Sequence, residues 1–214
     1  KEAFLNYHPR TIVLNTLDPD YFDFYKTYES YLEAFKKFAR KLPRDGYLFT
    51  NIDDEDIHEI LRELELHHFP QYNTFTYGAQ YEAAGYYLKD SKIYKKGTEL
   101  ALLDLQIPGL HNRMNATAAF AVCHTLGVKP ADIVKSLNSY SGAARRFEIK
   151  GVRNNTTIID DYAHHPAEIL ATLQAARERY PKARICAVFQ PHQYSRTKVL
   201  LEEFATAFSQ ANSV

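Results

Sequence analysis

Apolar and polar positions follow two different periods along the first part of the chain. Short runs of apolar and β-branched residues predict strands, whereas apolar residues three and four positions apart predict helices. The helical pattern is clear at 29–42, where a proline follows directly. In order, the pattern predicts a strand at 11–17, a helix at 29–42, a strand at 47–52, a helix at 53–64 and a strand at 74–77. This alternation indicates an α/β fold with a mostly parallel sheet.

The pattern changes after this region. Residues 86–94 and 98–107 show strand-like alternation, with turn-forming residues at 90–91 and 96–97. These segments predict antiparallel hairpin strands added to the parallel sheet, as in many mixed sheets. Two helices are expected next, at 112–126 and at 130–137.

A second strand–helix rhythm begins after a stretch of small residues at 141–144, which is the best hinge candidate. The pattern predicts a strand at 156–159, a helix at 166–179, a strand at 184–189 and a helix at 197–211. A strand–helix–strand unit needs parallel strands, so we expect a second sheet here. The sequence therefore predicts two domains, at 1–144 and 145–214.

Composition and charge exclude several classes of protein. The 26 Lys and Arg residues balance the 26 Asp and Glu residues, so the chain has no excess of positive charge that would favour binding to nucleic acid. Apolar runs fall far short of the ~20 residues that span a bilayer, and no export signal opens the chain, so a cytoplasmic protein is expected. Cys123 and Cys186 stand in apolar surroundings, which predicts two buried small side chains and no disulfide framework. The chain starts with Lys1 and ends in a helix-like stretch, so we expect a piece of a longer protein.

Polar clusters follow both predicted strands of the second domain. The first is DDYAHHP at 160–166, and the second is QPHQYSRT at 190–197. Neighbouring parallel strands lie ~4.8 Å apart, so we expect these loops to meet at the carboxyl edge of the sheet, each before a helix N-terminus. Arg196 can hold a carboxylate or phosphate with two parallel hydrogen bonds, and the histidines can exchange protons near neutral pH. The loops therefore predict a site for a small anionic or zwitterionic ligand.

Two other interpretations of these loops remain open. Asp161 or His165 can instead cap the following helix. A zinc site from His164, His192 and Asp161 is possible by residue type.

The first domain carries one polar string at the start of a predicted helix. His111, Asn112 and Asn115 follow a glycine turn, and the two asparagine amides can read the edge of an adenine or a ribose. The alternative is the polar first turn of a core helix. Arg145 and Arg146 follow the hinge-like residues and form either a phosphate clamp or a solvated pair.

Four strings together resemble the Mur ligase family: GLHNRMNATAAFAV, ARRFE, IIDDYAHHPAEI and AVFQPHQYSRT. The resemblance covers nearly the whole chain. It implies the end of a P-loop-type central domain followed by the start of a Rossmann-like C-terminal domain. It also implies an ATP- and Mg²⁺-dependent amide-bond ligase of peptidoglycan synthesis that joins L-alanine to UDP-N-acetylmuramic acid through an acyl phosphate.

The resemblance further implies a role for each candidate residue. His111, Asn112 and Asn115 would hold the adenine and ribose of ATP, Arg146 would lie near ATP, and Asp161 would contact the nucleotide. Tyr162, His164, His192 and Arg196 would line the L-alanine pocket, with His164 and Arg196 as the catalytic pair.

The chain departs from the family pattern in two places. It has no G-x-x-x-x-G-K-[ST] phosphate loop. The resemblance places this loop, together with the UDP-binding domain, before residue 1. This chain alone is therefore expected to be inactive. Tyr21 stands where relatives have a magnesium-binding histidine, and tyrosine is a poor ligand for magnesium, so no metal ligand is assigned. The alternatives are a murein tripeptide recycling ligase, a non-catalytic module that binds a nucleotide or cell-wall precursor, and a zinc hydrolase.

Overall fold

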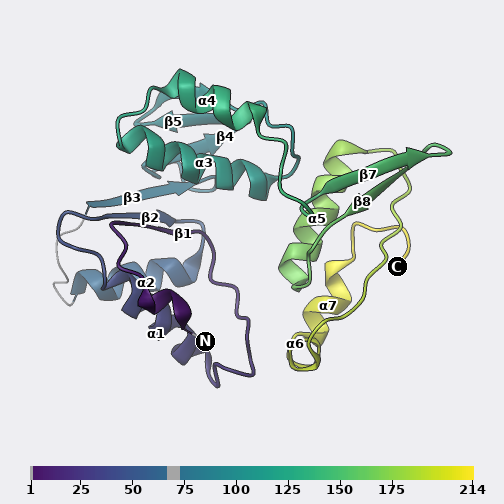
Figure 1. Cartoon of the computed structure of the whole chain (residues 1–214), viewed down its shortest axis with the longest axis horizontal. Coiled ribbons are helices and arrows are strands. Elements are labelled where there is room, and N and C mark those ends of the chain that lie inside the picture. The colour runs from purple at the N-terminus through teal and green to yellow at the C-terminus, as the bar shows by residue number, and fades with distance from the viewer. Residues whose placement is uncertain (1, 67–72) are drawn as a thin grey trace. The chain divides into compact units, whose positions relative to one another are not determined.

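The computed structural model describes residues 2–66 and 73–214, which fall into two compact units (Figure 1). The first unit comprises the chain up to residue 103 together with residues 114–136. The second unit comprises residues 104–113 and 137–214. The domain boundary expected after residue 144 stays a prediction.

A six-stranded sheet forms the centre of the first unit, with the strands in chain order from β1 to β6. Its strands are β1 (Thr11–Leu14), β2 (Tyr47–Asn51), β3 (Asn73–Gly78), β4 (Tyr86–Lys89), β5 (Lys92–Lys95) and β6 (Thr98–Leu102). The first four strands run parallel, and β4, β5 and β6 pair antiparallel. The prediction of a mostly parallel sheet with added hairpin strands is therefore confirmed.

Among the described residues, five helical segments lie wholly or mostly in this unit. They are the 3-10 helix η1 (Ala3–Asn6), α1 (Tyr28–Ala39), α2 (Glu55–Leu66), α3 (Leu110–Thr125) and α4 (Pro130–Ser139). The hydroxyl of Thr27 accepts a hydrogen bond from the Ser30 backbone N–H at 3.2 Å, which caps α1. Figure 1 shows α1 and α2 beside β1 and β2, and their apolar faces form one buried cluster with these strands.

The second unit differs from its predicted strand order. Its sheet has two antiparallel strands, β7 (Glu148–Arg153) and β8 (Thr156–Asp160), and its helices are α5 (Pro166–Arg179), α6 (Tyr194–Val199) and α7 (Leu201–Ala207). The strand β7 was not predicted. Asn154 and Asn155 both have positive φ, which is the backbone of a tight hairpin turn.

The strand predicted at 184–189 is wrong. This segment forms only an isolated bridge, from Cys186 to Ser213, and the Ala187 N–H donates to the Ser213 carbonyl at 2.8 Å. The segment is thus tied to residues near the chain end, and the parallel pairing that we expected with 156–159 does not form. The single helix predicted at 197–211 is divided into α6 and α7 at Leu200.

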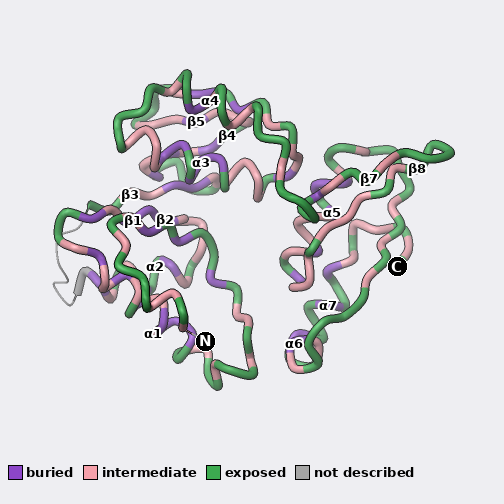
Figure 2. Tube along the Cα trace, in the orientation of Figure 1, coloured by how far each residue is buried: buried purple, intermediate pink, exposed green. Residues whose placement is uncertain are grey.

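The segment 184–189 is also less buried than the strands of the first unit (Figure 2). The core strands and helices of the first unit are lined with buried residues, whereas residues around 184–189 are largely open to solvent, with Val188 97% exposed. Cys186 is exposed and Cys123 is half-buried, so the prediction that both cysteines are buried is wrong.

Candidate functional site

Asp161 fastens the loop after β8 to the residues before β7. Its Oδ2 accepts a hydrogen bond from the Phe147 N–H at 2.7 Å, and its Oδ1 accepts one from the Ala163 N–H at 2.8 Å. The Tyr162 N–H donates to the Arg145 carbonyl at 2.7 Å. Both carboxylate oxygens therefore organise the loop itself, and neither caps α5.

The residues on the other side of this connection have an unusual backbone. Arg145 and Phe147 have φ values of 57° and 51°, a left-handed conformation that costs energy for residues other than glycine. Two carboxylates hold them there: Asp161 accepts a hydrogen bond from the Phe147 N–H, and Glu148 Oε2 accepts one from the Arg145 N–H at 2.9 Å. Backbone strain that is held in this way is typical of functional sites.

This conformation places two cations against one aromatic ring. The guanidinium carbons of Arg145 and Arg146 lie 4.9 and 5.7 Å from the centroid of the Tyr162 ring, which is 48% exposed. The His164 ring meets the same ring edge-on at 5.0 Å. The ring attracts both cations, and two guanidinium groups beside one accessible ring suit a ligand that carries negative charge.

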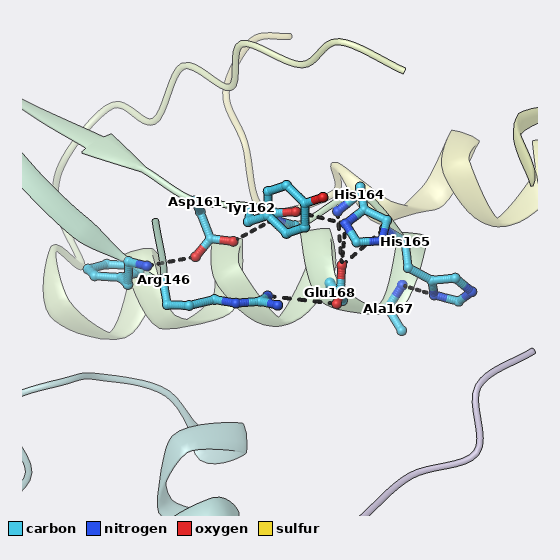
Figure 3. Close-up of polar contacts among 9 residues, drawn as sticks. Arg146, Asp161, Tyr162, His164, His165, Ala167 and Glu168 are labelled. Atoms are coloured by element: carbon cyan, nitrogen blue, oxygen red, sulfur yellow. Dashed lines mark hydrogen bonds and ion pairs between the residues drawn. The ribbon is translucent and has the colours of Figure 1, made fainter. Parts of the chain in front are cut away.

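Glu168, in the first turn of α5, connects the histidines to Arg146 (Figure 3). Its Oε2 accepts hydrogen bonds from the His164 and His165 backbone N–H groups at 2.9 and 3.3 Å and lies 3.4 Å from His164 Nδ1. Its Oε1 lies 3.7 Å from a guanidinium nitrogen of Arg146. The sequence analysis missed Glu168, although its position three residues after His165 matches the spacing of a capping box.

His165 is a helix cap, as the alternative interpretation proposed. Its Nδ1 accepts a hydrogen bond from the Ala167 N–H at 3.3 Å, and Glu168 completes the capping box. Because its neighbour His164 points to Tyr162 and Glu168 instead, the two histidines have different tasks.

His111 lies in the second unit, within the electrostatic range of Asp161 and Arg146. Burial lowers the pKa of His111 below its usual value, and the positive charges of Arg113 and Arg146 act in the same direction, while the Asp161 charge opposes them. The ring packs on Gly109, since a Cβ on that residue would lie 2.7 Å from His111 Cε1. The structure thus brings His111 into the neighbourhood of the Asp161 loop.

The two asparagines of this helix make different contacts. Asn112 Nδ2 donates to the Pro108 carbonyl at 2.7 Å, which closes the turn before α3. Asn115 belongs to the first unit, where its Oδ1 accepts from Asn15 Nδ2 at 3.5 Å. The Tyr77 hydroxyl in turn donates to Asn15 Oδ1.

Asn15 and Tyr77 were not predicted as site residues. Asn15 follows β1 directly, and Tyr77 lies near the end of β3, so both are at the carboxyl edge of the parallel sheet. That edge is where ligands bind in open α/β sheets, and this position is the signal that could have identified them.

Arg196 lies on α6 and is only 2% exposed. One of its guanidinium nitrogens donates to the His192 carbonyl at 3.2 Å. We expected this loop to meet the Asp161 loop because of a strand at 184–189, and that strand does not form. The meeting of the two loops, and the roles of His192 and Arg196, stay predictions.

The described ranges hold no group of three His, Cys, Asp or Glu side chains arranged to bind a metal ion. The alternative zinc site of His164, His192 and Asp161 is therefore not formed there. Tyr21, at the position of the expected magnesium ligand, is 57% exposed and has a φ of 58°. In the same ranges, no helix has the length and apolar character needed to cross a membrane.

Comparisons with known proteins point to one family. The family model described as the Mur ligase middle domain matches residues 3–123, and that described as the Mur ligase, glutamate ligase domain matches residues 145–214. A UDP-N-acetylmuramate–L-alanine ligase of Acetivibrio thermocellus is 40% identical over all of this chain and 46% of its own length. The chain thus spans about half the length of the curated relatives that it matches.

Solved structures agree with this result. The UDP-N-acetylmuramate–alanine ligase of Thermotoga maritima matches 99% of this chain and 46% of its own length, with a TM-score of 0.76 and 27% identity. A murein peptide ligase of Psychrobacter arcticus matches 98% of the chain and 44% of its own length with a TM-score of 0.65 and, at 21% identity, shares the fold. Because one family model alone covers more than half of the residues, the chain belongs to the Mur ligase family.

Proposed function

We propose that the complete protein containing this chain is an ATP-dependent ligase that joins L-alanine to UDP-N-acetylmuramic acid. The observation that carries the proposal is the cluster of Arg145, Arg146, Tyr162, His164 and Glu168, which offers cations, an aromatic ring and an imidazole to one small ligand. The names of the relatives at 40% identity support the choice of substrates.

The proposed reaction has two steps. A carboxylate oxygen of the muramic acid attacks the γ-phosphorus of ATP, which gives an acyl phosphate and ADP. The amine of L-alanine then attacks the carbonyl carbon, and phosphate leaves as the amide forms. Both steps move negative charge, so fixed cations and orientation are the main contributions that a protein can make.

The asparagines of α3 are suited to a nucleotide. Asn115 uses its Oδ1 toward Asn15, so its amide N–H groups remain the donors for a ligand. Asn112 uses an amide N–H toward Pro108, so its Oδ1 remains the acceptor. A donor and an acceptor three positions apart on one helix, together with His111, match the edge of an adenine or a ribose.

The cations and the second loop complete the proposed assignment. Arg146 would face the phosphates, and Asp161 acts on the nucleotide through the loop conformation that its two hydrogen bonds impose. Tyr162, His164, His192 and Arg196 would receive L-alanine, with Arg196 on its carboxylate. Magnesium would supply neutralisation of phosphate charge, and no described residues are assigned as its ligands.

The test measures ADP release by the complete protein with each substrate present or omitted in turn. ADP release should require both L-alanine and UDP-N-acetylmuramic acid, and omission of either should abolish it. ADP release with the tripeptide L-alanyl-γ-D-glutamyl-meso-diaminopimelate in place of L-alanine would instead identify a recycling ligase. Nucleotide binding without any ADP release would indicate a binding module.

A further inference from the structure

His164 has two polar neighbours on one side of its ring. Its Nδ1 lies 2.9 Å from the Tyr162 carbonyl oxygen and 3.4 Å from Glu168 Oε2 (Figure 3). Both neighbours are acceptors, since a carbonyl and a carboxylate have no proton to donate. The favoured neutral ring therefore carries its hydrogen on Nδ1 and has the lone pair on Nε2.

Glu168 is held firmly in the position that imposes this choice. Two backbone N–H groups donate to its Oε2, and the Arg146 guanidinium lies beside its Oε1. The same carboxylate belongs to the capping box at the start of α5, a helix of 14 residues. Among the described residues, Tyr162 and Glu168 are the titratable groups in contact with the His164 ring, and Arg146 lies beyond Glu168.

We propose that Glu168 is a positioning residue that fixes His164 as the Nδ1–H tautomer, so that His164 Nε2 removes a proton from the α-ammonium group of the amino-acid substrate. This inference rests on the proposed ligase function. The substrate N–H bond breaks and an Nε2–H bond forms. The amine lone pair then attacks the acyl carbon, and the carbon–oxygen bond to phosphate breaks, with its electron pair leaving on the phosphate. The amide nitrogen loses its second proton to solvent.

The carboxylate has a further effect after the proton transfer. The imidazolium that forms carries positive charge 3.4 Å from Glu168, which stabilises it. This division of tasks is the one that an aspartate and a histidine have in serine hydrolases. Here the acidic residue lies four positions after the histidine, within the first turn of the helix.

The first test separates the charge of Glu168 from its capping role. Glu168→Gln keeps an oxygen that can accept from the backbone N–H groups, as glutamine does in a capping box, but removes the charge. The control is Glu203→Gln, an exposed acid in the first turn of α7. Nitrogen-15 NMR of the complete protein, at mildly alkaline pH, should show the Nδ1–H tautomer of His164 in the parent and in the control. Glu168→Gln should shift His164 toward the Nε2–H form. An Nε2–H form in the parent, or an unchanged tautomer in Glu168→Gln, would overturn the proposal.

The second test uses the complete protein and separates the two chemical steps. Hydroxylamine traps the acyl phosphate as a hydroxamate, which reports the first step without the amino acid. Glu168→Gln should slow formation of the L-alanine amide about tenfold to hundredfold more than it slows formation of the hydroxamate, in the range of general-base effects. This deficit should shrink as the pH rises, because the substrate ammonium then loses its proton unaided.

The outcomes distinguish this inference from the proposed function. A parent protein that gives neither hydroxamate nor amide contradicts the ligase function itself. A parent that gives both, together with a Glu168→Gln variant of equal amide rate, contradicts only the role of Glu168. A deficit that stays constant with pH indicates a merely structural effect and also overturns the inference.

Discussion

The Phe147 backbone N–H donates a hydrogen bond to Asp161 Oδ2 at 2.7 Å, across the two ends of the β7–β8 hairpin. Phe147 has a left-handed backbone and a buried side chain, so Asp161 anchors a strained residue that is also part of the core. The arginines over Tyr162 depend on the same connection. The geometry of the candidate site therefore depends on one carboxylate that need not touch a ligand.

Replacing that carboxylate should destabilise the chain. Asp161→Ala removes the acceptor of two backbone hydrogen bonds, which we expect to lower the free energy of unfolding by about 1–3 kcal/mol. Its neighbour Asp160 forms only a partly exposed ion pair, 3.5 Å from Arg145 Nε, so Asp160→Ala should cost about 0.5 kcal/mol or less. Urea unfolding of both variants measures the difference, and equal losses would contradict the role given to Asp161.

A second prediction concerns Gly109, which has a φ of 101° and lies under the His111 ring. Gly109→Ala adds a Cβ 2.9 Å from that of Ala175, so left-handed strain and overpacking should together cost about 2–5 kcal/mol. Gly97, with a φ of 76° and open space around it, is the matched control, and Gly97→Ala should cost only about 1–2 kcal/mol of strain. Thermal unfolding of the two variants gives the comparison, and an equal loss in both would show that His111 and Ala175 do not constrain this position.

The third prediction is a pH dependence that involves His111. Because its pKa in the folded state is lowered from the usual 6.5, the unfolded chain binds a proton more readily than the folded chain. Its contribution to stability is thus complete above pH 6.5 and is lost progressively as the pH falls below that value. His124, whose pKa is also lowered by burial, acts in the same direction.

Urea unfolding at pH 7.5 and pH 5.5 tests this sign. The parent chain should lose more stability between these pH values than His111→Gln does, since the variant lacks the titrating group. A variant with the same or a larger loss on acidification would contradict the inferred environment of His111.

Much of the first unit could be predicted from the sequence, and less of the second. The strands β1 and β2 are short apolar runs, and β3 alternates threonine with Phe75 and Tyr77, so the residue pattern identifies all three. The strand β7 escapes this pattern because its apolar residues Ile149 and Val152 point to solvent. The segment 184–189 is apolar enough for a strand, but its sequence does not specify the partner with which it pairs.

The candidate site, like the fold, could be predicted from the sequence only in part. The residues of the loop 160–166 and the pair Arg145–Arg146 could be identified as candidates because reactive side chains follow a strand or a hinge. Glu168 was harder to identify, because histidine is an unusual N-cap residue and the capping-box spacing is less evident without serine or threonine. The contact of Asn15 with Tyr77 depends on the register of β1, β2 and β3, which the sequence does not specify.

Arg196 provides the fourth prediction. Arg196→Lys keeps the positive charge but removes the planar fork that binds a carboxylate with two hydrogen bonds. Loss of one charge-assisted hydrogen bond should cost about 1.5–3 kcal/mol, which in the complete protein should raise the KM for L-alanine by roughly tenfold to more than a hundredfold. The KM for ATP should change little. A rise in the KM for ATP with an unchanged KM for L-alanine would assign Arg196 to the phosphates instead.

Competition between two amine substrates tests the central claim most directly. The complete protein would be incubated with ATP, UDP-N-acetylmuramic acid, and equal concentrations of isotope-labelled L-alanine and L-alanyl-γ-D-glutamyl-meso-diaminopimelate, and the products would be identified by mass spectrometry. The account predicts one dominant product, UDP-N-acetylmuramic acid that carries a single labelled alanine, formed together with ADP and phosphate. A dominant tripeptide product, or no new amide while the nucleotide is bound, would contradict it.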